Sequence, residues 1–294
     1  MMNIEKLKQE KTIQDLLEFC IINIDKPQNP TSFDVSDFVR KTLNPLGVRK
    51  TSHFGTLDPK VTGVLPIALN RACKLTGFFL GEDKEYTGIM RVHEEVSLKK
   101  IEEAIKKKFL GKILQTPPVK SRVKRQERER EVKSFDLLEK NGKDFLFKTE
   151  VQGGTYIRKL IDDLGKELET GAHMLELRRI RAGIFKEEKS VNLYDFVKSV
   201  EEFKKGNESS LRKILVPAEI VSEVYKKVEV KEKSVNRLMT GKPVLHEDLN
   251  KKIKLQTNEI ISLFSPSNFI GMYKVVNDNE VFAKPMFVLQ PIKN

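Results

Sequence analysis

A short segment punctuated by glycine and proline, residues 55–69, constrains the fold of this chain most strongly. Its first part, Gly-Thr-Leu-Asp-Pro at residues 55–59, must form a loop, because glycine allows unusual backbone conformations and proline removes a hydrogen-bond donor. The apolar run over residues 64–69 is typical of a buried strand. The segment therefore predicts a single carboxylate, Asp58, on a rigid loop just before a core strand.

Asp58 can be interpreted in two ways. A carboxylate held between Leu57 and Pro59, among apolar neighbours, stands where an enzyme would place a nucleophile. An aspartate before proline also often hydrogen-bonds its own backbone in a turn. The local sequence leaves both interpretations open.

Hydrophobic periodicity predicts both strands and helices elsewhere in the chain. Strands are expected over residues 20–24, 86–93 and 145–151, and helices over residues 31–43, 97–109 and from Thr155 onward. Residues 1–15 are polar and predict a short helix or an arm, and residues 201–210 predict a surface loop. After about residue 226, short strands alternate with turn residues, which is typical of a small β-barrel.

The charge balance favours a polyanionic partner. The chain of 294 residues carries 54 Lys and Arg against 42 Asp and Glu, a formal net charge of +12. Each basic side chain placed on a phosphate releases a condensed counterion, so such an excess favours nucleic acid. A solvated, lysine-rich surface explains the same number, and charge alone does not separate the two.

Other classes of function find no support in the sequence. The two cysteines, Cys20 and Cys73, are far apart, which predicts neither a disulfide nor a zinc ribbon and favours a reducing, cytoplasmic compartment. The four histidines lack ligand-like spacing, so no metal site is expected. No glycine-rich phosphate loop is present, and no apolar run is long enough to predict a membrane span.

Two further residues are candidates for the same site as Asp58. Arg158 falls in the first turn of its predicted helix, where the helix dipole disfavours a cation. A nearby anion, either Asp58 or an RNA phosphate, would explain it, although an arginine turned to solvent is the alternative. Tyr86 could offer a stacking face to a base, but a tyrosine that opens a strand is usually packed in a core or at an edge.

A basic segment follows a pair of prolines. Its first half has no acidic residue and favours phosphate contact, whereas glutamates in its second half allow local ion pairs on a solvated surface. The expected RNA-binding residues are Lys120, Arg122, Lys124 and Arg125.

Several short motifs follow one another in order between residues 20 and 185. They are Lys26-Pro27, Thr31-Ser32, residues 53–59, residues 63–66, Lys84-Glu85-Tyr86, Pro117-Pro118, Val123-Lys124-Arg125, residues 154–158 and Leu177-Arg178-Arg179. In this order they resemble the TruB family of pseudouridine synthases, and within it the archaeal and eukaryotic dyskerin-like branch. In the tail, residues 239–242 resemble a signature of the PUA domain, a small RNA-binding barrel.

The resemblance implies an enzyme that isomerises uridine to pseudouridine in structured RNA. It implies no cofactor and no metal, because the bond that is broken is remade within the same nucleotide. Asp58 would be the nucleophile, Tyr86 would stack on the uracil and Arg158 would orient the carboxylate. The expected substrate-binding residues are Lys26, His53 and Leu177. The target base must leave its stack to be reached, so base flipping is expected.

The resemblance also implies an architecture. We expect an α+β fold, with a catalytic domain around a mixed, mainly antiparallel sheet and a small PUA-like C-terminal β-barrel. The expected boundaries are an N-terminal arm or helix at 1–15, a catalytic domain at 16–225 and a PUA-like domain at 226–294.

The leading hypothesis for its role is the catalytic subunit of an H/ACA guide-RNA ribonucleoprotein. Such a subunit acts on rRNA or tRNA with a guide RNA, a small zinc-ribbon-like protein, a β-barrel partner and a kink-turn-binding protein. A stand-alone tRNA T-loop pseudouridine synthase is the first alternative. A non-catalytic RNA-binding scaffold is the second, although a scaffold would not need Asp58, Tyr86 and Arg158 together.

Overall fold

The computed structural model describes residues 3–117, 124–266 and 268–290, and these form two compact units. The larger unit comprises residues 21–215. The smaller unit comprises residues 1–20 together with residues 216–294. The first twenty residues, in which a short helix or an arm was expected, therefore fold with the C-terminal part of the chain.

The larger unit is built on a mixed, mainly antiparallel sheet. Its main path runs β10-β1-β3-β8-β4-β7-β6-β5, with β2 added to β3, β9 added to β8 and β11 (Leu215–Pro217) added to β1. The strands are β1 (Cys20–Lys26), β2 (Thr51–His53), β3 (Thr62–Leu69), β4 (Lys84–Val92), β5 (Gly111–Gln115), β6 (Arg128–Asn141), β7 (Asp144–Val151), β8 (Ala172–Ala182), β9 (Phe185–Lys186) and β10 (Val191–Asn192). The parallel pairs are β1 with β10 and β3 with β8.

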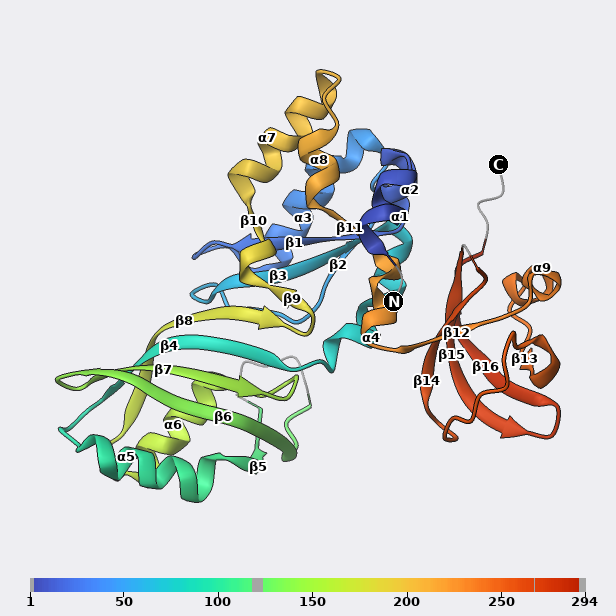
Figure 1. The fold of residues 1–294 in the computed structure, drawn as a ribbon. Coiled ribbons are helices and arrows are strands. Elements are labelled where there is room, and N and C mark those ends of the chain that lie inside the picture. The colour runs from blue at the N-terminus through green and yellow to red at the C-terminus, as the bar shows by residue number, and fades with distance from the viewer. Residues whose placement is uncertain (1–2, 118–123, 267, 291–294) are drawn as a thin grey trace. The chain divides into compact units, whose positions relative to one another are not determined.

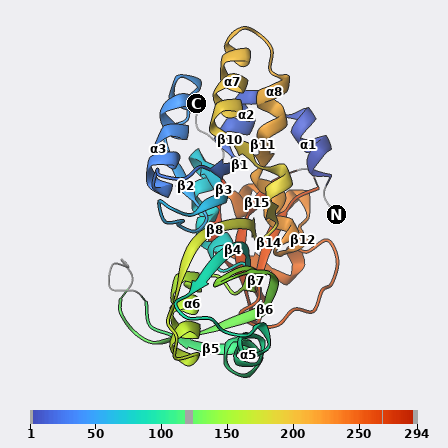
Figure 2. The ribbon, with the colours of Figure 1, turned by 90° about the vertical axis from the view of Figure 1, so that its left-hand side faces the viewer.

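Helices cover the two ends of this sheet. The helices of the larger unit are α3 (Ser32–Leu43), α4 (Thr76–Leu80), α5 (Leu98–Ala104), α6 (Ile157–Glu167), α7 (Leu193–Lys204) and α8 (Ser209–Ile214). Figures 1 and 2 show α3, α7 and α8 beside β1 and β10 at one end, and α5 and α6 near β6 and β7 at the other. Helix α6 contacts β8, so its apolar stripe closes the core of that half.

The smaller unit is a curled, five-stranded half-barrel in the order β12-β14-β15-β16-β13. Its strands are β12 (Lys226–Glu229), β13 (Val244–Leu245), β14 (Ile260–Phe264), β15 (Phe269–Asp278) and β16 (Val281–Val288), and β11 (Leu215–Pro217) leads into it. Its helices are α1 (Ile4–Glu10), α2 (Ile13–Glu18) and α9 (Val235–Met239). This sheet is consistent with a PUA-like domain, and the predicted α+β fold class is confirmed.

Local sequence explains most element boundaries. Thr31 accepts a hydrogen bond from the backbone of Asp34, whose side chain accepts one in return, so α3 begins at the predicted position. Ser97 caps α5, which passes into a π-helical turn at residues 105–109.

Two expectations for helix ends require correction. The predicted loop at residues 201–210 is wrong in part, because α7 continues to Lys204 and α8 begins at Ser209. The helix expected from Thr155 begins two residues later, at Ile157. Among the residues that the structure describes, no helix is both long and apolar enough to cross a membrane.

Candidate active site

The loop that carries Asp58 is fixed from behind by Ser32. The Ser32 hydroxyl is buried in the first turn of α3, where it accepts from the Leu57 N–H at 2.7 Å and donates to the Leu57 carbonyl at 2.9 Å. Leu57 is itself buried, and the Val61 N–H donates to the backbone carbonyl of Asp58 at 3.0 Å. Both peptide groups beside Asp58 are therefore held, while its own side chain stays 48% exposed.

A buried lysine holds the far side of the same loop. The Lys26 ammonium is fully buried and donates to the Pro27 carbonyl at 2.8 Å and the Pro59 carbonyl at 3.2 Å. Burial lowers the pKa of Lys26, and the nearby Asp58 carboxylate opposes that shift. Lys26 thus joins the end of β1 to the residue that follows Asp58.

A buried arginine closes the loop across its base. The Arg179 guanidinium, from β8, donates to the Val64 carbonyl at 2.8 Å and to the Gly55 carbonyl at 3.0 Å. Gly63 has a φ of +102°, and a Cβ there would lie 2.2 Å from the Arg179 carbonyl oxygen. Only glycine permits this approach of β3 to β8.

Asp58 and Arg158 form an ion pair, with 2.8 Å between Asp58 Oδ2 and Arg158 Nη2. Arg158 is the second residue of α6, so the anion expected near this helix terminus is present. Arg158 is 60% exposed and Asp58 48%, so solvent screens the attraction and the pair contributes little to stability. Its clearest effect is to orient the carboxylate within an accessible site.

Tyr86 and Leu177 lie on the buried faces of neighbouring strands. Tyr86 of β4 is opposite Arg179 of β8, and Gly88 is opposite Leu177. Both side chains are 8% exposed, and a Cβ on Gly88 would lie 3.0 Å from the Leu177 side chain. Because Arg179 also holds the Gly55 carbonyl, this strand pair is tied to the loop that carries Asp58.

His53 lies at the start of the loop, at the end of β2. Its Nε2 is 3.1 Å from the Thr56 Oγ1. Burial, together with the charge of Arg179, lowers the pKa of His53, which favours the neutral imidazole. The next residue, Phe54, is buried and stacks on Phe79 with 4.7 Å between ring centroids, so it anchors the loop in the core.

The expected RNA-binding residues fall partly beyond the described part of the chain. Lys120 and Arg122 lie outside the described residues. Lys124 and Arg125 are exposed, just before β6.

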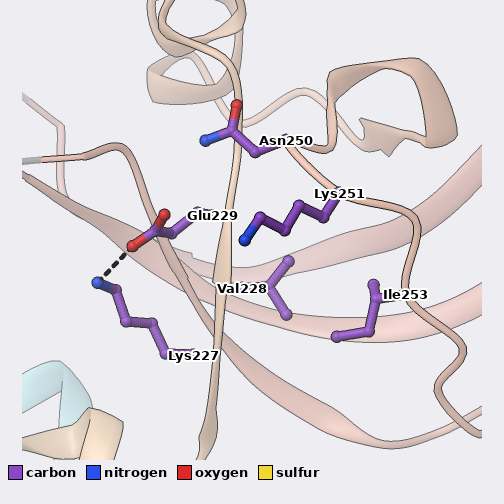
Figure 3. Close-up of a pocket in the computed structure, with 6 residues that line it drawn as sticks. All are labelled: Lys227, Val228, Glu229, Asn250, Lys251 and Ile253. Carbon is purple, nitrogen blue, oxygen red and sulfur yellow. Dashed lines mark ion pairs between the residues drawn. The ribbon is translucent and has the colours of Figure 1, made fainter. Parts of the chain in front are cut away.

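The smaller unit contains an open pocket of about 220 Å³ that involves none of the predicted site residues. Figure 3 shows Lys227 and Glu229 paired at its rim, with 2.6 Å between ammonium and carboxylate. The remaining lining residues are Val228, Asn250, Lys251 and Ile253.

Ser32 and Arg179 were not among the site residues predicted from the sequence. Arg179 occupies an inward-facing position of a strand, one residue after Arg178, which forms ion pairs with Asp25 and Glu187. An arginine at such a position is unusual, because a buried cation needs acceptors. That pattern could have identified it as a residue that organises a loop.

Comparison with known families defines the class of protein. Residues 41–157 match the model of the TruB family pseudouridylate synthase N-terminal domain, and residues 158–222 match that of the tRNA pseudouridylate synthase B C-terminal domain. Together these matches cover more than half of the chain. The protein is thus an RNA isomerase that forms pseudouridine.

Similar proteins point to one family. The probable tRNA pseudouridine synthase B of Methanocaldococcus jannaschii is 44% identical over 236 residues, which cover 80% of this chain and 69% of that protein. That of Archaeoglobus fulgidus is 41% identical over 233 residues, which cover 79% of this chain and 70% of that protein. The chain belongs to the TruB family of pseudouridine synthases.

Solved structures similar to this chain come from the dyskerin-like branch. The crystal structure of a Cbf5-Nop10-Gar1 complex contains a chain with a TM-score of 0.89 and 35% identity, and the match covers 97% of this chain and 89% of that one. The structure of an H/ACA ribonucleoprotein bound to a substrate RNA that contains 2'-deoxyuridine contains another, with a TM-score of 0.87 and 33% identity. That match covers 97% of this chain and 89% of that one.

Proposed function

We propose that Asp58 is the nucleophile of the isomerisation and that Arg158 orients it. The observation that carries this proposal is the 2.8 Å ion pair between the two, on a loop whose backbone is held on both sides of Asp58. In the reaction, the bond between ribose carbon and uracil nitrogen breaks and a carbon–carbon bond forms within the same nucleotide. A proton moves from the uracil carbon to the nitrogen, so no co-reactant is consumed.

The other predicted residues support this chemistry around the flipped nucleotide. Tyr86 provides the face on which the uracil stacks, and Leu177, on the adjacent strand, forms the apolar wall beside it. His53, held neutral by burial, offers a hydrogen-bonding edge at the entrance of the loop. Lys26 acts through the backbone, because its ammonium is occupied by two carbonyl groups.

We further propose that the enzyme works as the catalytic subunit of a guide-RNA ribonucleoprotein. This is supported by similarity, over 97% of the chain, to chains in a Cbf5-Nop10-Gar1 complex and in an H/ACA ribonucleoprotein bound to substrate RNA. The partners would be a guide RNA, a Nop10-like and a Gar1-like protein, and a kink-turn-binding protein, on rRNA or tRNA targets. Stand-alone modification of tRNA is the second candidate, favoured by the name of the curated relatives, tRNA pseudouridine synthase B.

Pseudouridine mapping on an unmodified tRNA transcript separates these two roles. The purified protein is tested alone, with guide RNA and with guide RNA plus partner proteins, and Asp58→Ala is the matched inactive control. The guide-dependent proposal predicts that modification follows the sequence of the guide and needs the partners. Asp58-dependent modification of the T-loop by the protein alone would instead establish the stand-alone role.

The exposed basic segment is proposed to contact RNA phosphates. Neutralising Lys124 and Arg125 together should weaken RNA binding. It should also make the plot of log binding constant against log salt concentration less steep, by roughly 0.7–0.9 in slope per lost phosphate contact. An unchanged salt slope would mean that these cations are only solvated.

A further inference from the structure

A buried glutamine is hydrogen-bonded to the residue from which α6 starts. Gln115, the last residue of β5, is 3% exposed. Its Oε1 accepts from the Tyr156 N–H at 3.0 Å, and its Nε2 donates to the Tyr156 carbonyl at 3.2 Å. One side-chain amide therefore pairs with both backbone polar groups of a single residue, across forty residues of sequence.

Tyr156 is the N-cap of α6, and its side chain makes no capping hydrogen bond. Its carbonyl accepts the first hydrogen bond of the helix, from the Leu160 N–H at 3.0 Å. The preceding glycine, Gly154, has a φ of +87°, so the chain turns sharply just before the helix. The direction in which α6 starts thus depends on what holds the Tyr156 backbone, and Gln115 does so.

Arg158 lies two residues after Tyr156, and little in its own surroundings fixes its side chain. Its side chain is 60% exposed, so packing fixes only a minor part of it. The 2.8 Å contact with Asp58 therefore depends on where the first turn of α6 lies. A shift of that turn by about 1 Å would lengthen the contact beyond hydrogen-bond distance, and misplacements of this size can cost on the order of 100-fold in rate.

We propose that Gln115 is a positioning residue for pseudouridine formation, which acts by holding the N-cap of α6 so that Arg158 reaches Asp58. This inference rests on the proposed roles of Asp58 and Arg158. Gln115 itself touches neither residue, and its function is to connect the end of β5 with the start of α6.

The test is a double-mutant cycle measured in single-turnover reactions. Gln115→Met keeps the shape of the side chain and removes both hydrogen bonds, and it should slow the reaction on the order of 10- to 100-fold. RNA affinity should stay within about threefold, because the lost term is orientation and not binding. In an Arg158→Ala background the same change should slow the reaction by less than about twofold, because Gln115 acts through Arg158.

A matched control removes another hydrogen bond at a helix start in the same unit. Asn192 caps α7 by accepting from the Asp195 N–H at 2.8 Å, and α7 carries none of the predicted site residues. Asn192→Ala should lower thermal stability and leave the rate constant unchanged. Equal slowing by Asn192→Ala and Gln115→Met, or equal slowing by Gln115→Met with and without Arg158, would overturn the proposal.

Hydrogen exchange tests the contact independently of activity. The Tyr156 amide should be protected in the wild type and lose protection in Gln115→Met, whereas unchanged protection would overturn the proposal. If the wild type forms no pseudouridine when assembled with guide RNA, target RNA and partner proteins, the proposed function fails, and the exchange measurement still decides whether Gln115 holds this backbone. If Gln115→Met does not fold, Gln115→Glu replaces it in the double-mutant cycle. It keeps the acceptor for the Tyr156 N–H and loses the donor to the Tyr156 carbonyl, so the reaction should still slow while the Tyr156 amide stays protected, and a wild-type rate would overturn the proposal.

Discussion

A pair of glycine substitutions measures how tightly the Asp58 loop is bound to the sheet. Gly63 and Gly47 both have left-handed backbone conformations, with φ values of +102° and +94°. They differ in their surroundings. A Cβ at Gly47 would meet nothing within 4 Å, whereas one at Gly63 would lie 2.2 Å from the carbonyl oxygen of Arg179. Gly47→Ala therefore isolates the conformational cost, and Gly63→Ala adds the steric one.

The expected difference follows from these contacts. Alanine in the left-handed region costs roughly 1–2 kcal/mol at either position. At Gly63 the obstacle is backbone of the paired strand β8, which cannot move aside like the end of a side chain. Overpacking adds about 1–3 kcal/mol, and we expect the upper end here, so Gly63→Ala should lose about 4–5 kcal/mol in all.

Urea unfolding of the two variants gives the free energies, and single-turnover pseudouridine formation gives the rate. Gly63→Ala should also react more slowly, because opening the contact between β3 and β8 displaces Arg179 from the Val64 and Gly55 carbonyls. Gly47→Ala should keep the wild-type rate. Equal destabilisation by the two substitutions would refute the close approach of β3 to β8.

Two further substitutions probe the buried cations behind the loop. Arg179→Lys keeps the charge but replaces the rigid fork, whose Nε and Nη2 each donate to a different carbonyl, with a single ammonium, so it should lose about 1.5–3 kcal/mol of stability, measured by urea unfolding; an unchanged stability would contradict the two-carbonyl contact. Lys84 donates to the Leu80 carbonyl at 2.8 Å, and burial, with the charge of Arg179, lowers its pKa from 10.5 to about 8. Between pH 8 and 10.5 the unfolded chain binds more protons at Lys84 than the folded chain does. The free energy of unfolding of the wild type, relative to that of Lys84→Met, should therefore rise with pH, by at most about 3 kcal/mol. A difference in stability that stays flat across this range would show that Lys84 titrates normally.

Local sequence carries enough information for most elements of the fold. The apolar run after the Asp58 loop became β3, and α3 and α5 lie within the ranges predicted for them. These features depend on periodicity and on hydrogen bonds between residues close in the chain, which a sequence displays directly. The position of Arg158 at a helix start left an ion pair with Asp58 open as one of several possibilities, and the resemblance to the TruB family implied that pair.

The contacts that position Asp58 could not be derived in this way. Arg179 and Gln115 act on backbone groups of residues distant in sequence, and backbone acceptors have no sequence pattern. The partial helix in residues 201–210 was missed because its polar residues also suit a solvated helix end. Packing of residues 1–20 with residues 216–294 likewise depends on long-range contacts.

The central claim is that Asp58 is the nucleophile, and the most direct test is pseudouridine mapping with wild-type and Asp58→Asn protein in the assembled complex with guide and target RNA. RNA binding is measured on the same samples. The change is nearly isosteric and removes only the charge, so the variant should form no pseudouridine while its RNA affinity stays within about threefold. Substantial pseudouridine formation by Asp58→Asn would contradict the account.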